Sequence, residues 1–244
     1  MAQYPLLRVR RKRTAANALG DGSAVKLADP AASITEWRLD YAGLTDAEAE
    51  ALAQFFRDVG GRLETFTFLD PGANLLLWSE DLDQSAWEKS PLAVVHAEAA
   101  DPFGGARAWR LANGGVMQTL NAPGWFTYCL SLYVRSEQGG SVRLARGGET
   151  AERAITARWS RVSFVSQRPD AEESVRFGVE AADGPVEIFG LQVEAQAAAS
   201  GYQRTAGRGG VYPNARLAED SFVQRTDGPG QHGCTLGIIH GERF

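Results

Sequence analysis

Three histidines are the first candidates for chemistry, because imidazole nitrogens bind metals and transfer protons. His96, His232 and His240 stand at no metal-ligand spacing. Two of them fall in or beside the last predicted hairpin, where a histidine with structural hydrogen bonds is more common than a ligand. The chain also has no GxSxG sequence, no P-loop and no GxGxxG between a strand and a helix. We therefore expect neither a metal nor a cofactor.

Paired carboxylates could support glycoside hydrolysis, which uses two acidic side chains on either side of the scissile bond. Such pairs occur at Glu80-Asp81 and Glu172-Glu173. Solvation of the protein surface explains both pairs without any chemistry, and no identifiable catalytic scaffold surrounds them. The sequence therefore predicts a protein that is not an enzyme.

Tryptophan offers a different kind of chemistry, because a flat indole ring packs against the apolar face of a sugar ring. One block of the chain holds five of the six: Trp78, Trp87, Trp109, Trp125 and Trp159. Trp125 follows Pro123-Gly124 at a predicted turn and is the leading candidate for carbohydrate contact, with Trp109 second. Trp159 opens a well-patterned strand and is expected in the core. The alternative is that all five are core residues.

A basic run near the start, Arg8 to Arg13, places five positive charges in six residues. Its alternation with Leu7 and Val9 indicates an edge strand or an arm. Basic clusters can contact nucleic acid, but no interleaved aromatic residues accompany this one, so no nucleic-acid binding is expected. The run is equally compatible with a solvated sheet edge and with an intersubunit contact to an acidic neighbour.

Composition limits the class of protein. A hydrophobic fraction of 44% and a charged fraction of 23% are ordinary for a globular protein. The net charge of −5 gives no reason to expect nucleic acid or an anionic membrane as a partner. No apolar run approaches the roughly 20 residues that span a bilayer, and no apolar segment follows the basic start, so neither membrane insertion nor a secretory signal is expected. Cys129 and Cys234 alternate with apolar residues and are expected as reduced core thiols.

The elements that would position these residues begin with a strand, a helix and a strand. Residues 33–41, SITEWRLDY, alternate as a half-buried strand does. Thr45 and Glu48 predict a capping box at the start of a helix that a glycine pair ends. The apolar stripe of this helix, expected to be buried against the sheet, consists of Leu52, Phe55, Phe56 and Val59. Residues 63–69 resume a strand, and the unit is too small to bury a core alone.

After this unit the pattern changes to short alternating segments with turn residues between them. In the clearest one, 126–135, the residues Phe126, Tyr128, Leu130, Leu132 and Val134 share a face. The predicted strands are 106–111, 115–120, 126–135, 141–146, 159–166, 174–180 and 185–194. Seven or eight short strands with hardly any helix signal predict an antiparallel jelly-roll β-sandwich.

The last segment supplies the strands that the first unit lacks. Residues 234–240 alternate again and are expected to form a hairpin with residues 215–224 across a Gly/Pro-rich turn. We therefore predict a discontinuous host domain, residues 1–72 plus 208–244, interrupted by a sandwich domain at 73–207. The host should be an α+β unit, a β-barrel or two-sheet arrangement with one flanking helix, which makes the whole chain mainly β.

The host residues carry a resemblance to a known family. The stretches LTDAEAEALAQFFRDVGGRLETFTFLDP and ARLAEDSFVQRTDGPGQHGCTLGIIH resemble the distal tail protein family of long-tailed bacteriophages and gene transfer agents. The pattern is an acidic-capped helix ending in Phe-Phe, a Gly-Arg step, a Phe-x-Phe strand and a Leu-Asp-Pro corner. The basic run at the start does not match any feature of that family.

The interrupting block resembles the sugar-binding-like sandwiches of phage tail and tail-fibre proteins. Those often open with NLLxxSExxxxxxW and close with a Gln-Val-Glu strand and a Tyr-x-x-Thr exit. The matching residues here are Asn74, Leu75, Leu76, Ser79, Glu80, Trp87, Gln192, Val193, Glu194, Tyr202 and Thr205.

These resemblances imply a structural virion protein of the phage tail tip or baseplate, made in the host bacterial cytoplasm. They imply a homo-oligomeric ring, usually a hexamer, that joins the tail-tube protein to the hub and fibre proteins of the tip. The peripheral sandwiches could contact host-surface polysaccharide. Two alternatives remain: a stand-alone carbohydrate-binding accessory protein and a tail-borne depolymerase.

Overall fold

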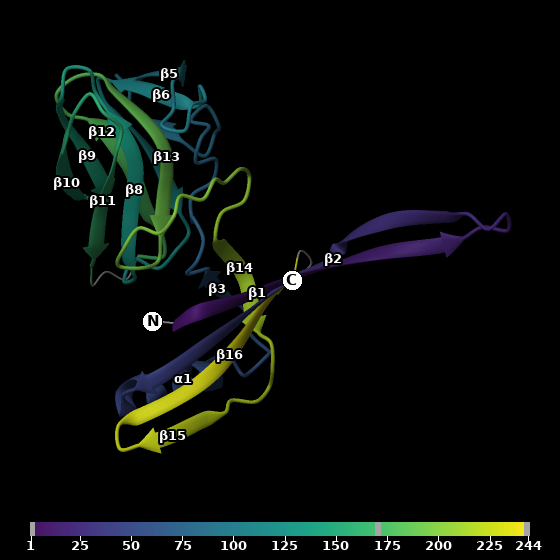
Figure 1. The fold of residues 1–244 in the computed structure, drawn as a ribbon. Coiled ribbons are helices and arrows are strands. Elements are labelled where there is room, and N and C mark those ends of the chain that lie inside the picture. Colours follow the sequence, from purple (N-terminus) through teal and green to yellow (C-terminus); the bar gives the residue numbers. More distant parts are fainter. Residues whose placement is uncertain (1–2, 169–171, 242–244) are drawn as a thin grey trace. The chain divides into compact units, whose positions relative to one another are not determined.

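The chain divides into two compact units in a computed structural model that describes residues 3–168 and 172–241 (Figure 1). Unit 1 consists of Met1–Phe68 and Tyr212–Phe244, and unit 2 is Leu69–Val211. The domain boundaries predicted from the sequence, 72/73 and 207/208, differ from these by about four residues at each crossing. Whether either unit folds alone stays a prediction.

Unit 1 is built on one six-stranded sheet with the order β1-β2-β16-β14-β3, and β15 pairs with β16 beside that path. Its strands are β1 (Gln3–Ala18), β2 (Ala24–Leu44), β3 (Phe66–Leu69), β14 (Val211–Leu217), β15 (Gln224–Gly228) and β16 (Gln231–Gly241). Within the described residues the sheet is open, because β1 and β3 end the order without pairing with each other. A single open sheet therefore replaces the barrel or two-sheet arrangement expected for the host domain.

The core of unit 1 lies on one face of this sheet. Alternation in β2 buries Trp37 and Leu39, which are 1% and 4% exposed, as the pattern of residues 33–41 predicts. The Trp37 ring meets the rings of Phe68 and Tyr212 edge-on, with centroid separations of 4.9 and 4.5 Å. Residues from both ends of the chain thus complete one core.

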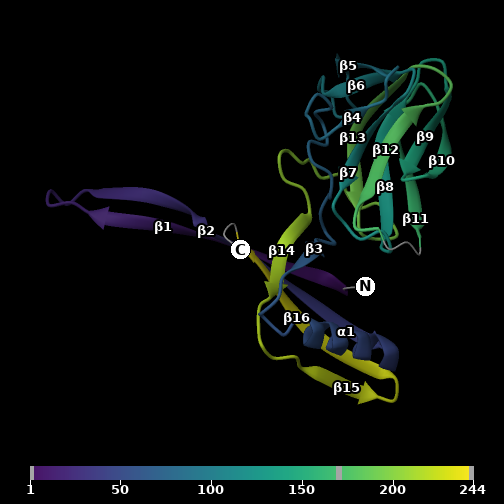
Figure 2. The same cartoon turned by 180° about the vertical axis from the view of Figure 1, so that it is seen from behind.

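The helix α1 (Asp46–Asp58) covers that face and packs against β2 and β16 (Figure 2). The capping box is confirmed: the Glu48 N–H donates to Thr45 Oγ1 at 3.3 Å, and the Thr45 N–H donates to Glu48 Oε2 at 2.9 Å. The hydrogen bonds from Thr45 lower the pKa of Glu48. Gly60 and Gly61, with φ of 60° and 64°, end the helix in the left-handed region as predicted.

The apolar stripe of the helix is less buried than its spacing predicts. Val59 is buried, whereas Phe55 and Phe56 are half-buried. Phe55 meets Phe66 edge-on at 5.0 Å, and Phe56 stacks on Phe222 at 5.7 Å. Each of the two rings therefore packs on a neighbouring ring and keeps part of its surface in water.

Replacing Phe55 or Phe56 with Ala should lower the free energy of unfolding of unit 1 by about 1–3 kcal/mol. This is below the ~3–5 kcal/mol typical of a fully buried Phe, because each ring is only partly removed from water. Chemical denaturation measures the loss, with the exposed Thr67→Ala as the control. A loss below about 0.5 kcal/mol for both variants would contradict the packing of the helix on the sheet.

The last hairpin differs in part from its prediction. The expected strand 215–224 is split, because β14 ends at Leu217 and β15 begins at Gln224. Between them the chain leaves the sheet, and the Asp220 carboxylate accepts a hydrogen bond from the Arg62 N–H at 2.9 Å. The segment also brings Phe222 onto the helix. The hairpin itself is confirmed, since β15 pairs with β16 across a turn that contains Gly230.

A two-stranded ribbon extends β1 and β2 beyond the rest of the sheet (Figure 1). We call residues 10–28 the arm. In the described residues β16 pairs with β2 only from Ile34 to Leu44, so the arm strands have each other as partners. Every residue of the arm is exposed, including Leu19, Val25 and Leu27 at 47%, 43% and 56%. The basic run lies on β1, an edge strand, as its alternation predicts.

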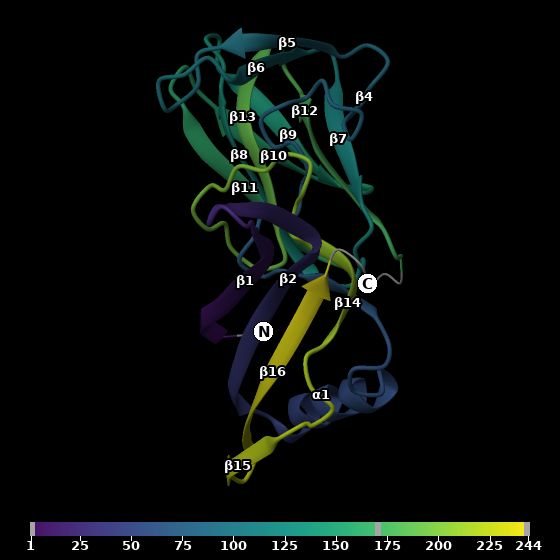
Figure 3. The same cartoon turned by 90° about the vertical axis from the view of Figure 1, so that its right-hand side faces the viewer.

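Unit 2 is an antiparallel β-sandwich of two five-stranded sheets (Figure 3). One sheet has the order β10-β9-β12-β7-β4, and the other, here called the β8 sheet, has the order β11-β8-β13-β6-β5. The strands are β4 (Glu88–Lys89), β5 (Val94–Ala99), β6 (Ala108–Ala112), β7 (Gly115–Leu120), β8 (Thr127–Arg135), β9 (Gly140–Arg146), β10 (Glu149–Ile155), β11 (Ser160–Gln167), β12 (Val175–Ala181) and β13 (Val186–Glu194). The mainly β fold class is confirmed.

The sandwich core follows the predicted alternation. Tyr128, Leu130, Leu132 and Val134 of β8 are at most 1% exposed and belong to one core cluster. All seven predicted strands are present within a few residues of their expected bounds. β4, β5 and β10 are additional strands, and each lies at the edge of a sheet.

Candidate functional site

The motif residues of unit 2 join its two chain ends. Asn74, which is 1% exposed, donates from Nδ2 to the carbonyl oxygens of Leu191 and Gln203 at 3.0 and 3.1 Å. Its Oδ1 accepts from the N–H groups of Leu76 and Val193, both at 3.1 Å. The buried Asn74 amide therefore connects three parts of unit 2: residues 74–76, near its start; β13; and residues 200–205, here called the closing segment.

Ser79 makes a second connection of the same kind. Its N–H donates to Thr205 Oγ1 at 3.2 Å, and the Thr205 N–H donates to Ser79 Oγ at 2.8 Å. The hydroxyl groups of Ser79 and Tyr202 are 2.9 Å apart, and burial raises the pKa of Tyr202. The motif from Asn74 to Thr205 thus has a structural role: its side chains join residues near the start of unit 2 to residues near its end.

Trp109, the second candidate for carbohydrate contact, is buried. Its ring is 7% exposed and belongs to the sandwich core. Its indole N–H donates to the carbonyl oxygen of Glu80 at 2.9 Å. This position leaves the ring unavailable for stacking on a sugar at the surface.

Trp159 is half-buried and lies outside the core, which corrects its expected position. The guanidinium of Arg135 lies over its ring, 5.0 Å from the centroid. The physical reason is the alternation of β11 itself. Phe164 of β11 points inward, and successive side chains alternate between the two faces. Trp159, which directly precedes β11, therefore falls on the outer face.

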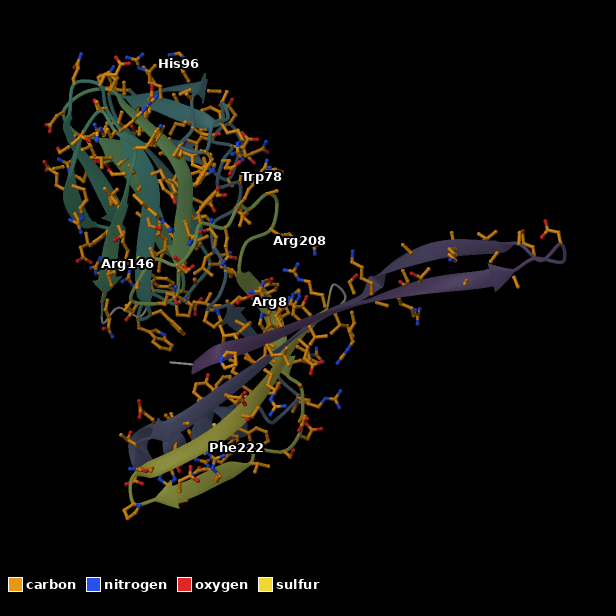
Figure 4. The ribbon with its side chains drawn as sticks, viewed as in Figure 1. Arg8, Trp78, His96, Arg146, Arg208 and Phe222 are labelled. Atoms are coloured by element: carbon orange, nitrogen blue, oxygen red, sulfur yellow. The ribbon has the colours of Figure 1, made fainter. Side chains whose placement is uncertain are left out.

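Trp125 is 58% exposed, as its turn position predicts. The carbonyl groups on either side of it, those of Gly124 and Phe126, both accept hydrogen bonds from Nη2 of Arg146, the second at 3.1 Å. Nη1 of Arg146 donates to the carbonyl oxygen of Ser166 at 2.6 Å. Arg146 is 1% exposed and lies inside the sandwich (Figure 4). A buried cation therefore fixes the loop that exposes Trp125.

Two further contacts make this loop rigid. The Arg146 guanidinium lies 5.0 Å from the ring centroid of Tyr128, whose hydroxyl donates to the carbonyl oxygen of Pro123 at 2.7 Å. Sequence reasoning missed Arg146, although its signal was present. Val142 and Leu144 point inward from β9, and Arg146 continues the same alternation.

The outer face of the β8 sheet carries charged and aromatic side chains in two rows across the strands. We call these rows, together with Phe103 and Trp159, the open face. The first row is Arg135, Glu187 and Arg110, and the second is Arg161, Tyr133 and Phe189, as the strand registers place them. Phe189 is only 1% exposed, because the rings of Phe103 and Tyr202 pack on it. Sequence reasoning did not single out this surface, because the strands that form it are far apart in the chain.

The basic run is partly neutralised on its own sheet. Arg11 forms an ion pair with Glu36 at 2.6 Å, and Arg13 pairs with Asp29. All four side chains belong to β1 and β2. Because these pairs are solvent-exposed, they stabilise the arm by only about 0–1 kcal/mol each.

His232 and Cys129 have structural surroundings, whereas His96 is exposed. His232 Nε2 is 2.7 Å from Asp46 Oδ1, and its Nδ1 is 2.9 Å from Thr226 Oγ1. Burial raises the pKa of the Cys129 thiol to about 11, so this thiol is protonated at neutral pH. No group of three potential metal ligands occurs among residues 3–168 and 172–241. No helix in the same ranges is long and apolar enough to cross a membrane.

No protein-family model and no curated protein matches this chain. Among solved structures, it is similar to the CBM22-1 xylan-binding domain of Paenibacillus barcinonensis Xyn10C, with 14% identity and a TM-score of 0.41 over 52% of this chain and 94% of that one. It is also similar to the enzymatically active domain of tailspike protein 4 of bacteriophage CBA120, with 9% identity and a TM-score of 0.39 over 52% of this chain and 22% of that one. These similarities are at the level of the fold and assign no ligand or activity to this chain.

Proposed function

We propose that this chain is a structural subunit of a phage tail tip, a distal tail protein. Unit 1 closes into a ring, expected to be a hexamer, that joins the tail tube to the hub and fibre proteins. Unit 2 is a peripheral sandwich that meets host-surface glycans through exposed aromatic side chains. The protein is a component of the virion and not a catalyst. The observation that supports ring formation is the exposed arm of unit 1.

Among the described residues of unit 1, nothing covers the arm. A two-stranded ribbon is marginally stable in water by itself, and this one exposes Leu19, Val25 and Leu27. An exposed strand edge also presents unpaired N–H and C=O groups to any neighbouring strand. Packing of the arm on an adjacent subunit would bury these apolar side chains and give the strand edge hydrogen-bond partners.

Charge favours a second copy of this chain as that neighbour. The arm, residues 10–28, holds five Lys or Arg and one Asp, a net charge of +4. The whole chain has a net charge of −5, so the remaining residues have −9. A basic arm that meets the acidic remainder of the next copy makes a head-to-tail contact, and such contacts close into a ring when the rotation allows.

The arm also provides the test. A variant in which an Asn-Gly turn replaces residues 13–29 shortens the ribbon and leaves the β2–β16 pairing from Ile34 onwards intact. Multi-angle light scattering should show a closed oligomer for the intact chain and a monomer for the variant. The exposed arm substitution Asn17→Ser, which keeps the arm length, is the control and should still assemble.

A stand-alone carbohydrate-binding accessory protein is the second candidate, favoured by the exposure of Trp125 and Phe103 on unit 2, at 58% and 61%. Such a protein has no need of an arm. An intact chain that stays monomeric at every concentration, and is unaffected by shortening of the arm, would support this candidate and overturn the ring.

A further inference from the structure

We propose that the open face of unit 2 binds a neutral oligosaccharide. This inference rests on the proposed function for its biological setting, the display of the sandwich to a host surface. The binding itself is a property of the side chains on one sheet. The aromatic rings can stack on a sugar, and the polar groups beside them can orient its hydroxyl groups.

Three aromatic rings line the open face: Phe103 on the loop between β5 and β6, Tyr133 on β8, and Trp159 directly before β11. Phe103 is 61% exposed and meets Tyr133 and Phe189 edge-on, with centroid separations of 5.4 and 5.8 Å. Tyr133 and Trp159 are half-buried. Neighbouring strands are about 4.8 Å apart, so rings beside β11, on β8 and on the Phe103 loop spread over roughly 10 Å, the scale of a short oligosaccharide.

The most exposed ring stands on a fixed loop. The buried carboxylate of Asp101 accepts hydrogen bonds from the N–H groups of Phe103 and Gly105 at 2.8 and 3.1 Å, and from Arg107 Nε at 3.0 Å. Burial raises the pKa of Asp101, but these hydrogen bonds outweigh it and lower the pKa overall. Phe103 is therefore held in place before any ligand arrives, which reduces the entropy that binding costs.

Polar groups lie beside the rings. Arg135 Nε donates to Glu187 Oε2 at 2.5 Å, next to Trp159. A shallow hollow at the end of the first row is lined by residues that include Arg110, Glu187 and Gln138. Guanidinium, carboxylate and amide groups present paired donors or acceptors, which suit the adjacent hydroxyl groups of a sugar ring.

The closing segment of unit 2 covers the rest of this face. Gln192 Nε2 donates to the carbonyl oxygen of Gly201 at 3.3 Å, and the Ser200 N–H donates to Glu194 Oε2 at 3.0 Å. The second row is partly covered by this segment, because the Ser200 carbonyl oxygen accepts a hydrogen bond from Arg161 and the Tyr202 ring meets Tyr133 and Phe189 at 6.5 and 5.5 Å. The part of the open face that stays uncovered runs from Phe103 past Tyr133 to Trp159 and includes the hollow. This part is the proposed sugar site.

The charges on the face select a neutral ligand. At and beside the hollow, Arg110 and Arg135 are balanced by Glu137 and Glu187, and Arg135 pairs with Glu187 at 2.5 Å, so an anionic sugar would have to compete with carboxylates already in place. The same charges disfavour a protein partner, because the centres of protein interfaces are depleted in charged residues. Hydroxyl groups, by contrast, can bond to both members of an ion pair.

The open face is a better site than the Trp125 loop. Trp125 lies beside Phe126 at a ring separation of 4.3 Å, and the backbone carbonyls on either side of it are already bonded to Arg146. That loop offers a ring for stacking but little that orients a sugar. The open face offers both.

The test titrates the intact chain calorimetrically with neutral hexasaccharides of glucose, mannose and galactose, and with hexauronates of the same length. At least one neutral hexasaccharide should bind, and Phe103→Ala and Trp159→Ala should each weaken it about tenfold. Leu92→Ala, which removes another exposed apolar side chain (78% exposed), should leave affinity within about twofold. Circular dichroism confirms folding, and Phe103→Ala remains informative if Trp159→Ala unfolds, because its ring is mostly outside the core.

Three results would overturn the inference: binding to none of the neutral probes, binding to hexauronates alone, or loss of binding with Trp125→Ala while both open-face variants bind normally. Light scattering on the same samples separates this inference from the proposed function. A chain that assembles but binds no sugar overturns the site alone. A chain that binds sugar through the open face but never assembles overturns the ring alone.

Discussion

Replacement of Arg146 with Met should lower the free energy of unfolding of unit 2 by about 3–5 kcal/mol. The guanidinium donates to the carbonyl groups of Gly124, Phe126 and Ser166, and it is 1% exposed. Methionine fills a similar length of space but donates nothing, so these buried acceptors lose their charged donor. Hydrogen bonds to charged groups contribute about 1.5–3 kcal/mol each, and their losses here are only partly additive.

Chemical denaturation of both proteins measures this change, and Arg143→Met is the matched control. Arg143 lies on the same strand, faces outward, and forms an ion pair with Glu180 at 3.1 Å with 40% of its side chain exposed. Its loss should therefore cost only about 0–1 kcal/mol. Fluorine NMR of 5-fluorotryptophan-labelled protein should also show greater mobility of Trp125 in Arg146→Met. Equal costs for the two variants would mean that Arg146 does not hold the loop.

Excision of the sandwich should leave unit 1 folded. In this variant a short Gly/Ser linker replaces residues 74–207. The Asp70 N–H donates to the carbonyl oxygen of Gly210 at 2.9 Å, so the two cut ends lie side by side and a short linker can join them. β3 and β14, which carry the chain to and from these ends, are also neighbours in one sheet. The closure of such a short loop costs little entropy.

Far-UV circular dichroism at room temperature and amide exchange in α1 provide the measurements for this variant. The helix and the β2–β16 pairing should be retained. Since a ring-forming protomer can be unstable alone, the measurement is repeated across a range of concentrations. A chain that is unfolded at all of them would show that unit 1 depends on the sandwich, contrary to the prediction.

Local patterns made the helix and the sandwich strands predictable. Thr45 and Glu48 indicated the capping box, and the Phe-x-Phe and Trp-x-Leu alternations marked which strand faces are buried. Strand β10 was missed because Glu149–Ile155 is rich in Ala, Glu and Arg, and most of its residues are exposed. A strand at the edge of a sheet needs little apolar sequence, so it leaves little pattern.

The surfaces were harder to predict than the core. Trp109, expected at the surface, is buried, and Trp159, expected in the core, lies on the outer face. The side of a sheet that a tryptophan faces depends on register as well as residue type. The full extent of the arm and the open face were also missed as surfaces. Phe103, Tyr133 and Trp159 come together only through the pairing of β11, β8, β13 and β6, and no local pattern in the sequence records that pairing.

Native mass spectrometry of the intact chain, with negative-stain electron microscopy of the same sample, decides whether the protein forms a ring. We expect one dominant species, a whole multiple of the chain mass with six copies expected, and closed rings in the images. Monomers at all concentrations, or open filaments without a defined length, would contradict the ring.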